Sequence, residues 1–159
     1  MKITWRELAI DISEESPDEI LKEWRWLIPS GLSLRMVSAL GDAFLENELG
    51  EIYWLDTGSA EISKIAASRA EFDTLRQTTN HADQWFSPML VGDLLSSGKG
   101  LSHRECFSYK IPLTLGGSFS PENFKPTSVA VHFNTLGQIQ KQVRDLPIGT
   151  KISSVKLGV

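Results

Sequence analysis

The sequence has little of several things, and each shortage excludes a class of protein. Its one cysteine, Cys106, allows no disulfide within the chain. No apolar run approaches the ~20 residues that a membrane-spanning helix needs, and residues 1–7 lack the apolar stretch of a signal peptide. Basic residues are outnumbered by acidic ones, 16 to 20, which weighs against a dedicated nucleic-acid-binding protein. We therefore expect a cytoplasmic protein with neither a membrane nor a nucleic acid as partner.

What is present suits one globular domain. The chain has 159 residues, of which 41% are hydrophobic and 23% charged, close to the average for folded proteins. A chain of this length buries enough surface to hold a core without disulfides or metals. We expect residues 1–159 to form a single domain, with residues 1–40 as a helical N-terminal extension.

Charge is distributed unevenly along the chain. From Lys99 onward there are eight basic and three acidic side chains, whereas residues 36–63 carry six acids and no lysine or arginine. Such an acidic block is either a solvated surface or a surface that attracts a basic partner electrostatically. Its acids are Asp42, Glu46, Glu48, Glu51, Asp56 and Glu61.

Local patterns predict helices, then a meander, then mixed elements. Thr4 and Glu7 have capping-box spacing at the start of a helix over 4–12, and Ser16-Pro17 is typical of a second helix start. Alternating apolar residues with glycine-containing turns then predict four strands. These strands cover 34–40, 43–45, 51–56 and 61–65, and together they form an antiparallel meander.

The second half alternates between helical and extended patterns. Ser68 and Glu71 form another capping box, and a helix over 83–95 must be kinked or split at Pro88. The remaining elements are a strand over 106–111, a long loop over 112–126, a strand over 128–133, a helix over 136–146 and a tail strand within 150–157. The fold class is therefore α+β. The predicted core comprises Phe44, Ile52, Trp54, Phe72, Leu75, Val129, Val131 and Ile139.

No residue pattern establishes a reaction. His103 and Cys106 have a spacing that zinc could use, but a second cysteine is missing. A Cys106–His132 pair could be a nucleophile with its base, although a lone cysteine in an apolar strand is usually a core residue. The glycines and serines of 115–120 match no phosphate-binding motif. We expect no catalytic residue, no metal and no cofactor, with a small thiol-dependent enzyme as the alternative.

Some aromatic residues are candidates for protein contacts. Trp26 lies off the apolar stripe of its helix, and Tyr53 alternates with Trp54, so one of these two rings faces away from the core if only one sheet face is buried. Exposed aromatic side chains beside acids are frequent anchors of protein interfaces.

Several short stretches, in their order and spacing, resemble a known family from about residue 41 to residue 152. The stretches are Gly41-Asp42-Ala43-Phe44, Gly50 to Gly58, Ala67 to Phe72, Leu115-Gly116-Gly117, Pro121-Glu122-Asn123, Val131-His132, Leu136 to Ile139 and Leu146 to Thr150. The chain resembles the immunity proteins of bacterial type VI secretion toxin pairs. The first 40 residues match less well.

This resemblance implies a non-catalytic cytoplasmic protein, monomeric or weakly dimeric when free, that binds one cognate toxin and blocks its active site. Toxins paired with the family include NAD-hydrolysing and DNA-degrading enzymes. A general ligand-binding or scaffold module with the same fold is a further alternative.

The candidate toxin-binding residues come from the acidic block, the long loop and Trp26. A carboxylate-rich loop can mimic phosphate in a toxin's cleft, which favours the loop after the second meander strand. Consecutive turns of a meander lie at opposite sheet ends, so residues 46–51 and 56–59 should be far apart. The candidates are Glu46, Asn47, Glu48, Glu51, Asp56, Trp26, Ser118 and Phe119.

Overall fold

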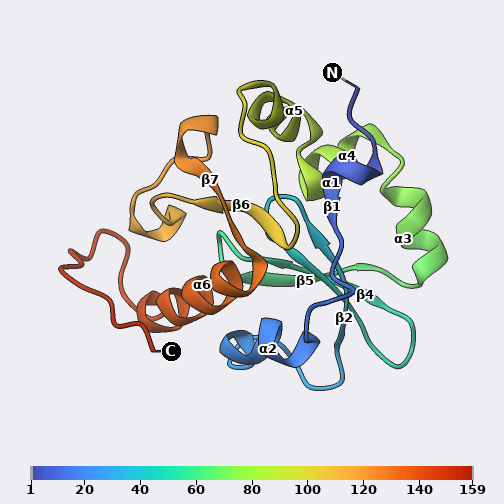
Figure 1. Ribbon diagram of the computed structural model, residues 1–159. Coiled ribbons are helices and arrows are strands. Elements are labelled where there is room, and N and C mark those ends of the chain that lie inside the picture. The colour runs from blue at the N-terminus through green and yellow to red at the C-terminus, as the bar shows by residue number, and fades with distance from the viewer. Residues whose placement is uncertain (1, 159) are drawn as a thin grey trace.

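The molecule is built around an antiparallel meander, as predicted. The structure is a computed structural model that describes residues 2–158. Within these residues five strands form one antiparallel sheet in the order β1-β2-β3-β4-β5, and β6 pairs with β7 in a separate ribbon (Figure 1). The α+β class is confirmed. The strands are β1 (Ala9–Ile10), β2 (Ser33–Ser38), β3 (Ala43–Glu46), β4 (Ile52–Asp56), β5 (Glu61–Ala66), β6 (Glu105–Tyr109) and β7 (Phe124–Ser128).

Helices cover both faces of the main sheet (Figure 1). On one face Phe44 of β3 packs against Phe72 and Phe86 from two helices. On the other face the Trp24 indole donates to the Phe133 carbonyl, which joins two covering helices. Both Tyr53 and Trp54 are consequently half-buried, rather than one of them facing solvent. The helices are α1 (Trp5–Leu8), α2 (Pro17–Leu21), α3 (Arg69–Leu75), α4 (Thr79–Phe86), α5 (Pro88–Ser96) and α6 (Val129–Val143), with 3₁₀ turns η1 (Lys22–Trp24), η2 (Leu113–Leu115) and η3 (Pro121–Asn123).

Capping residues start the helices where the sequence indicates. The hydroxyls of Thr4, Ser16 and Ser68 each accept a hydrogen bond from a backbone N–H of the first turn. The helical stretch around Pro88 is split, because Ser87 takes a left-handed conformation with φ 45° between α4 and α5. The first helix is shorter than predicted, since the chain turns extended at Ala9 and pairs with β2.

The predicted strand over 128–133 is wrong, because this segment begins α6. Ser128 caps the helix by accepting from the Val131 backbone N–H. Helical spacing then places Val129 and Phe133 in the core and leaves Val131 53% exposed, so Val131 does not belong to the predicted core. The β-branched valines favour a strand locally, but burial of one helix face outweighs that preference. Of the other predicted core residues, Phe44, Ile52, Phe72, Val129 and Ile139 are buried and Trp54 and Leu75 are half-buried.

The C-terminal tail is held by side chains instead of forming the predicted strand. Gln142 on α6 donates to the Lys156 carbonyl and accepts from the Lys156 N–H. Gln138, one turn earlier, makes the same pair of bonds with Gly158. A side-chain amide offers the same donor and acceptor as a neighbouring strand, so the tail binds along the helix. No helix within residues 2–158 has both the length and the apolarity that crossing a membrane requires.

Candidate functional site

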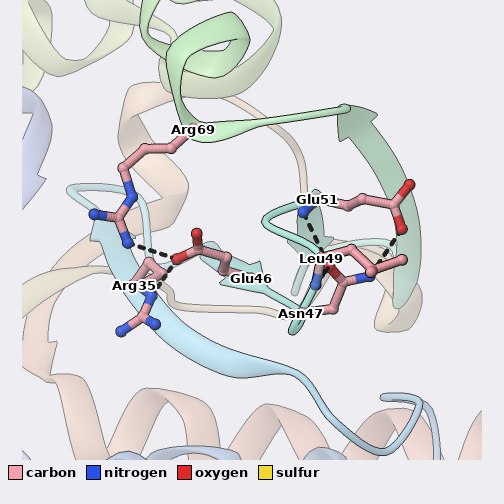
Figure 2. A network of polar contacts seen from close by, with 6 residues as sticks. All are labelled: Arg35, Glu46, Asn47, Leu49, Glu51 and Arg69. Atoms are coloured by element: carbon pink, nitrogen blue, oxygen red, sulfur yellow. Dashed lines mark hydrogen bonds and ion pairs between the residues drawn. The ribbon is translucent and has the colours of Figure 1, made fainter.

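Four of the predicted toxin-binding residues gather at one end of the sheet, in and beside the loop between β3 and β4. Figure 2 shows three of them, Glu46, Asn47 and Glu51. Glu46, at the end of β3, is only 9% exposed. Arg69 donates to its carboxylate across 2.7 Å, and Arg35 of β2 donates to the same oxygen. These two guanidinium groups hold the pKa of Glu46 below its usual range. The charge of Glu46 is therefore compensated within the protein.

The rest of this loop is also organised by internal bonds. The Asn47 side-chain oxygen accepts from the backbone N–H groups of Leu49 and Glu51, and its amide donates to the Glu51 carboxylate (Figure 2). Glu51 pairs further with Lys64 of β5, which lowers its pKa. Glu48 is exposed. Much of the acidity at this end is thus neutralised by bases that lie just outside residues 36–63 in the sequence.

The opposite end of the sheet holds two carboxylates whose partners differ in kind from the arginines of Glu46. There the turn before β3 lies against the turn after β4. Asp42 accepts from the Thr57 backbone N–H at 3.0 Å and from the Trp54 indole N–H at 3.2 Å. Asp56 accepts from the Gly58 N–H. Within residues 2–158 no lysine, arginine or histidine forms a salt bridge with either carboxylate. Burial, with the nearby charge of Asp56, raises the pKa of Asp42 to about 7.

A chain of buried hydrogen bonds through His132 supports the turn before β3. The carbonyl of Gly41 can only accept, so His132 Nε2, 2.8 Å away, carries the proton. Nδ1 then accepts from the Ser108 hydroxyl at 2.7 Å. Burial lowers the pKa of His132 to about 4, so the ring is neutral. Gly41 has φ +81°, and a Cβ there would lie 2.1 Å from His132 Nε2, so only glycine fits.

A cavity of about 110 Å³ lies between this sheet end, the end of α4 and the long loop. Two of its lining residues, Asp56 and Phe119, are among the eight predicted toxin-binding residues. Asp42, Trp54 and Tyr109 line the same cavity and are not among those eight. For Asp42 the available signal was its place in the first turn of the predicted four-strand meander. That turn must lie at the same sheet end as the third turn, which holds Asp56. For Tyr109 the sequence held no such signal, because its strand belongs to another sheet.

The remaining candidates lie apart from both groups or at their edge. Ser118 is exposed beside Phe119, and its hydroxyl bonds to that of Ser120. Trp26 is half-buried, stacks on Trp24 and donates its indole N–H to the Glu23 carbonyl. Seven of the eight predicted residues therefore form two groups at opposite sheet ends. Trp26 belongs to neither group and lines a different pocket with Ser59 and Ala60 of the turn after β4.

The residues considered for catalysis or metal binding are not assembled into such a site. Cys106 is fully buried, and burial raises the pKa of its thiol well above the usual range. His132 bonds to Ser108 rather than to Cys106. His103 contacts Glu14 at 3.2 Å. In the part of the chain that the structure describes, no three potential metal ligands cluster together.

Comparison with known proteins supports the resemblance seen in the sequence. The family model for the C-terminal part of the type VI secretion immunity protein Tdi1 matches residues 66–140. The resemblance to type VI secretion immunity proteins is thereby confirmed over this region, and the match supports an immunity role. No curated protein matches the sequence.

A solved structure shares the fold. The crystal structure of Atu4351 from Agrobacterium tumefaciens is similar with a TM-score of 0.52 at 14% sequence identity. The similarity covers 79% of this chain and 63% of that one, so this chain spans less than two thirds of the length of Atu4351. At this identity the likeness concerns the fold alone.

Proposed function

We propose that this protein is the immunity partner of a secreted antibacterial toxin and that it inhibits the toxin by blocking its active site. The match of residues 66–140 to the Tdi1 immunity family carries this proposal. The matched region includes Tyr109 and Phe119, which line the cavity, and His132, which supports it from below. The proposed toxin hydrolyses NAD or degrades DNA.

The chemistry of those substrates gives a reason for an acidic inhibitor. NAD and DNA both carry phosphates, so an enzyme acting on either needs a cleft that accepts negative charge. Acidic groups that are not already paired can enter such a cleft. Of the acids at the β3–β4 loop, Glu46 and Glu51 form salt bridges within the protein, and Glu48 forms none within residues 2–158. At the other end, Asp56 lies near the exposed ring of Phe119. We propose that both ends contact the toxin and that the Asp56 end contributes more, because aromatic anchors carry most interface energy.

A protection assay tests the proposal. The toxin is taken as the protein encoded beside this one, and it is expressed in bacteria with and without this chain. We expect growth only when both are present, and a stable complex of the two purified proteins. A toxin that remains fully active with an excess of this protein would overturn the proposal.

Two further measurements separate the alternatives. Cys106→Ser should preserve protection, whereas a thiol-dependent enzyme would lose its activity. Because opposite charges accelerate association, raising salt from about 50 mM to about 500 mM should slow complex formation much more than dissociation. A salt-independent association rate would remove the electrostatic part of the proposal.

A further inference from the structure

We infer that the cavity between the turns at Asp42 and Asp56 binds a guanidinium group, presented by an arginine side chain of a partner protein. The inference rests on the proposed function for the identity of that partner, the toxin. The chemistry of the cavity is independent of it and can be tested without the toxin.

The size of the cavity selects a side chain rather than a whole ligand. Its volume is about 110 Å³, whereas pockets for small-molecule ligands and cofactors usually enclose roughly 300–1,000 Å³. A nucleotide would not fit. The planar head of one arginine, with the end of its aliphatic stem, is of the right scale.

The charge of the cavity calls for a cation. Asp42 and Asp56 both line it, and among residues 2–158 every hydrogen-bond donor to either carboxylate is a neutral backbone, hydroxyl or indole group. Two nearby carboxylates repel each other, and a positive partner would relieve that repulsion. Burial and the charge of Asp56 raise the pKa of Asp42 to about 7, which agrees with this geometry. The contrast with Glu46, which has two arginines of its own, shows that the fold supplies cations elsewhere.

Tyr109 is an independent feature that points to a ligand at this cavity. It is 7% exposed, and its hydroxyl forms no hydrogen bond within residues 2–158. No side-chain polar atom sealed from solvent in that part lacks a partner, so the Tyr109 hydroxyl is not sealed, and Tyr109 lines the cavity. A Cβ at Gly58 would lie 2.5 Å from this hydroxyl, which places it beside the turn that follows Asp56. The oxygen is thus available to accept from an incoming N–H group.

The walls favour arginine over lysine. Trp54, Trp85 and Phe119 line the cavity with aromatic rings, and Phe119 is 54% exposed. A planar guanidinium stacks on such rings and offers five N–H donors in a fixed plane to two carboxylates and a hydroxyl. The compact ammonium of lysine has three donors and cannot stack.

The first experiment uses the free protein and small probes. N-acetyl-arginine methylamide is titrated while the indole N–H signals of Trp54 and Trp85 are followed by NMR, and the neutral citrulline analogue serves as the matched probe. We expect saturable shifts with the arginine probe and at least tenfold weaker binding of citrulline. Equal binding of the two probes would overturn the inference. So would the absence of any shift of either indole signal at the highest soluble concentration of the arginine probe.

Variants locate the binding in the cavity. Asp56→Asn keeps an oxygen for the turn and removes one charge, and Tyr109→Phe removes only the unbonded hydroxyl. We expect Asp56→Asn to weaken the arginine probe about tenfold and Tyr109→Phe about threefold. Asp93→Asn makes the same change of charge on the exposed side of α5 and should have no effect. Equal weakening by Asp93→Asn would show a non-specific charge effect and contradict the assignment.

The second experiment asks whether the toxin supplies the arginine. Asp56→Asn should weaken the toxin complex at least tenfold relative to Asp93→Asn, and replacing the responsible toxin arginine by lysine should weaken it similarly. If the arginine probe binds but the toxin complex ignores Asp56→Asn, the source of the guanidinium is a free small molecule and the partner named here is wrong. If the wild-type protein binds no toxin while the probe still binds, the proposed function fails and the cavity chemistry stands.

Discussion

The two ends of the sheet carry similar numbers of acids, but the groups that contact these acids differ in charge. At the β3–β4 end, Glu46 and Glu51 are paired with Arg35, Arg69 and Lys64, so their charges stabilise the fold. At the other end, the hydrogen-bond donors that Asp42 and Asp56 receive from the described residues are all neutral. An acidic stretch in a sequence can therefore consist of one part that is already satisfied and another that still lacks a cation.

Among the variants that compare the two sheet ends, the largest effect is expected at Gly41, where the buried hydrogen bonds support the unpaired end. Gly41→Ala would bring a Cβ to within 2.1 Å of His132 Nε2 at a residue with φ +81°. The ring is buried and its other nitrogen bonds to Ser108, so moving it away would break this contact. We expect a loss of about 3 kcal/mol or more in the free energy of unfolding, measured by chemical denaturation. Gly100→Ala, in an open loop, is the control and should cost less than ~1 kcal/mol. Similar stabilities for both variants would show that the turn is not held as described.

The second effect concerns the pH dependence of that same end. The folded pKa of Asp42, about 7, exceeds the unfolded value near 3.8, so the folded state keeps a proton that the unfolded state releases across this window. This carboxyl therefore makes the protein less stable as pH rises from about 4 to about 7. Asp42→Asn has no such loss.

Between pH 4 and pH 8 we thus expect the stability of Asp42→Asn to gain on the wild type by on the order of 2–4 kcal/mol. His132 acts in the opposite direction. Its folded pKa of about 4 lies below the unfolded value of 6.5, so stability is lost as pH falls from 6.5 to about 4. That contribution is common to both proteins and cancels in the difference. Denaturant melts of the two proteins at both pH values test this, and a difference that does not change with pH would contradict it.

The third effect breaks the paired end. Glu46→Lys would place a third cation beside Arg35 and Arg69 at a buried residue. We expect a loss of about 1–2 kcal/mol in the free energy of unfolding. Glu48→Lys makes the same change of charge on an exposed residue of the same loop and should stay within ~0.5 kcal/mol. If both variants melt alike, the ion pairs of Glu46 do not contribute to stability.

The smallest effect tests the segment that the sequence misassigned. If residues 128–133 were a core strand, Val131→Asp would bury an unpaired charge. In the structure Val131 is exposed in the first turn of α6, where a carboxylate is favourable. We expect a change within ~0.5 kcal/mol, seen as a nearly unchanged melting temperature. Val129→Asp, two residues earlier and fully buried, should unfold the protein or nearly so, which is the matched comparison.

The sequence by itself determined the elements whose signals are local. The hydroxyl caps at Thr4, Ser16 and Ser68 mark helix starts because a cap needs only the next turn of the chain. The meander followed from alternation and turns, since antiparallel neighbours joined by short loops pair almost by necessity. The consecutive turns at 46–51 and 56–59 were accordingly expected at opposite sheet ends, and they lie there.

Only the tertiary structure decided what depends on residues far apart in the chain. Val129 and Val131 fit a strand locally, but packing of one face of α6 against η1 made the segment helical. The acidic block looked uniform because its bases, Arg35, Lys64 and Arg69, lie just outside it in sequence, and strand pairing brings them in. The cavity joins a turn of the meander to Tyr109 of a separate sheet. Charge compensation and enclosure are properties of distances in space, and no pattern along the chain encodes those distances directly.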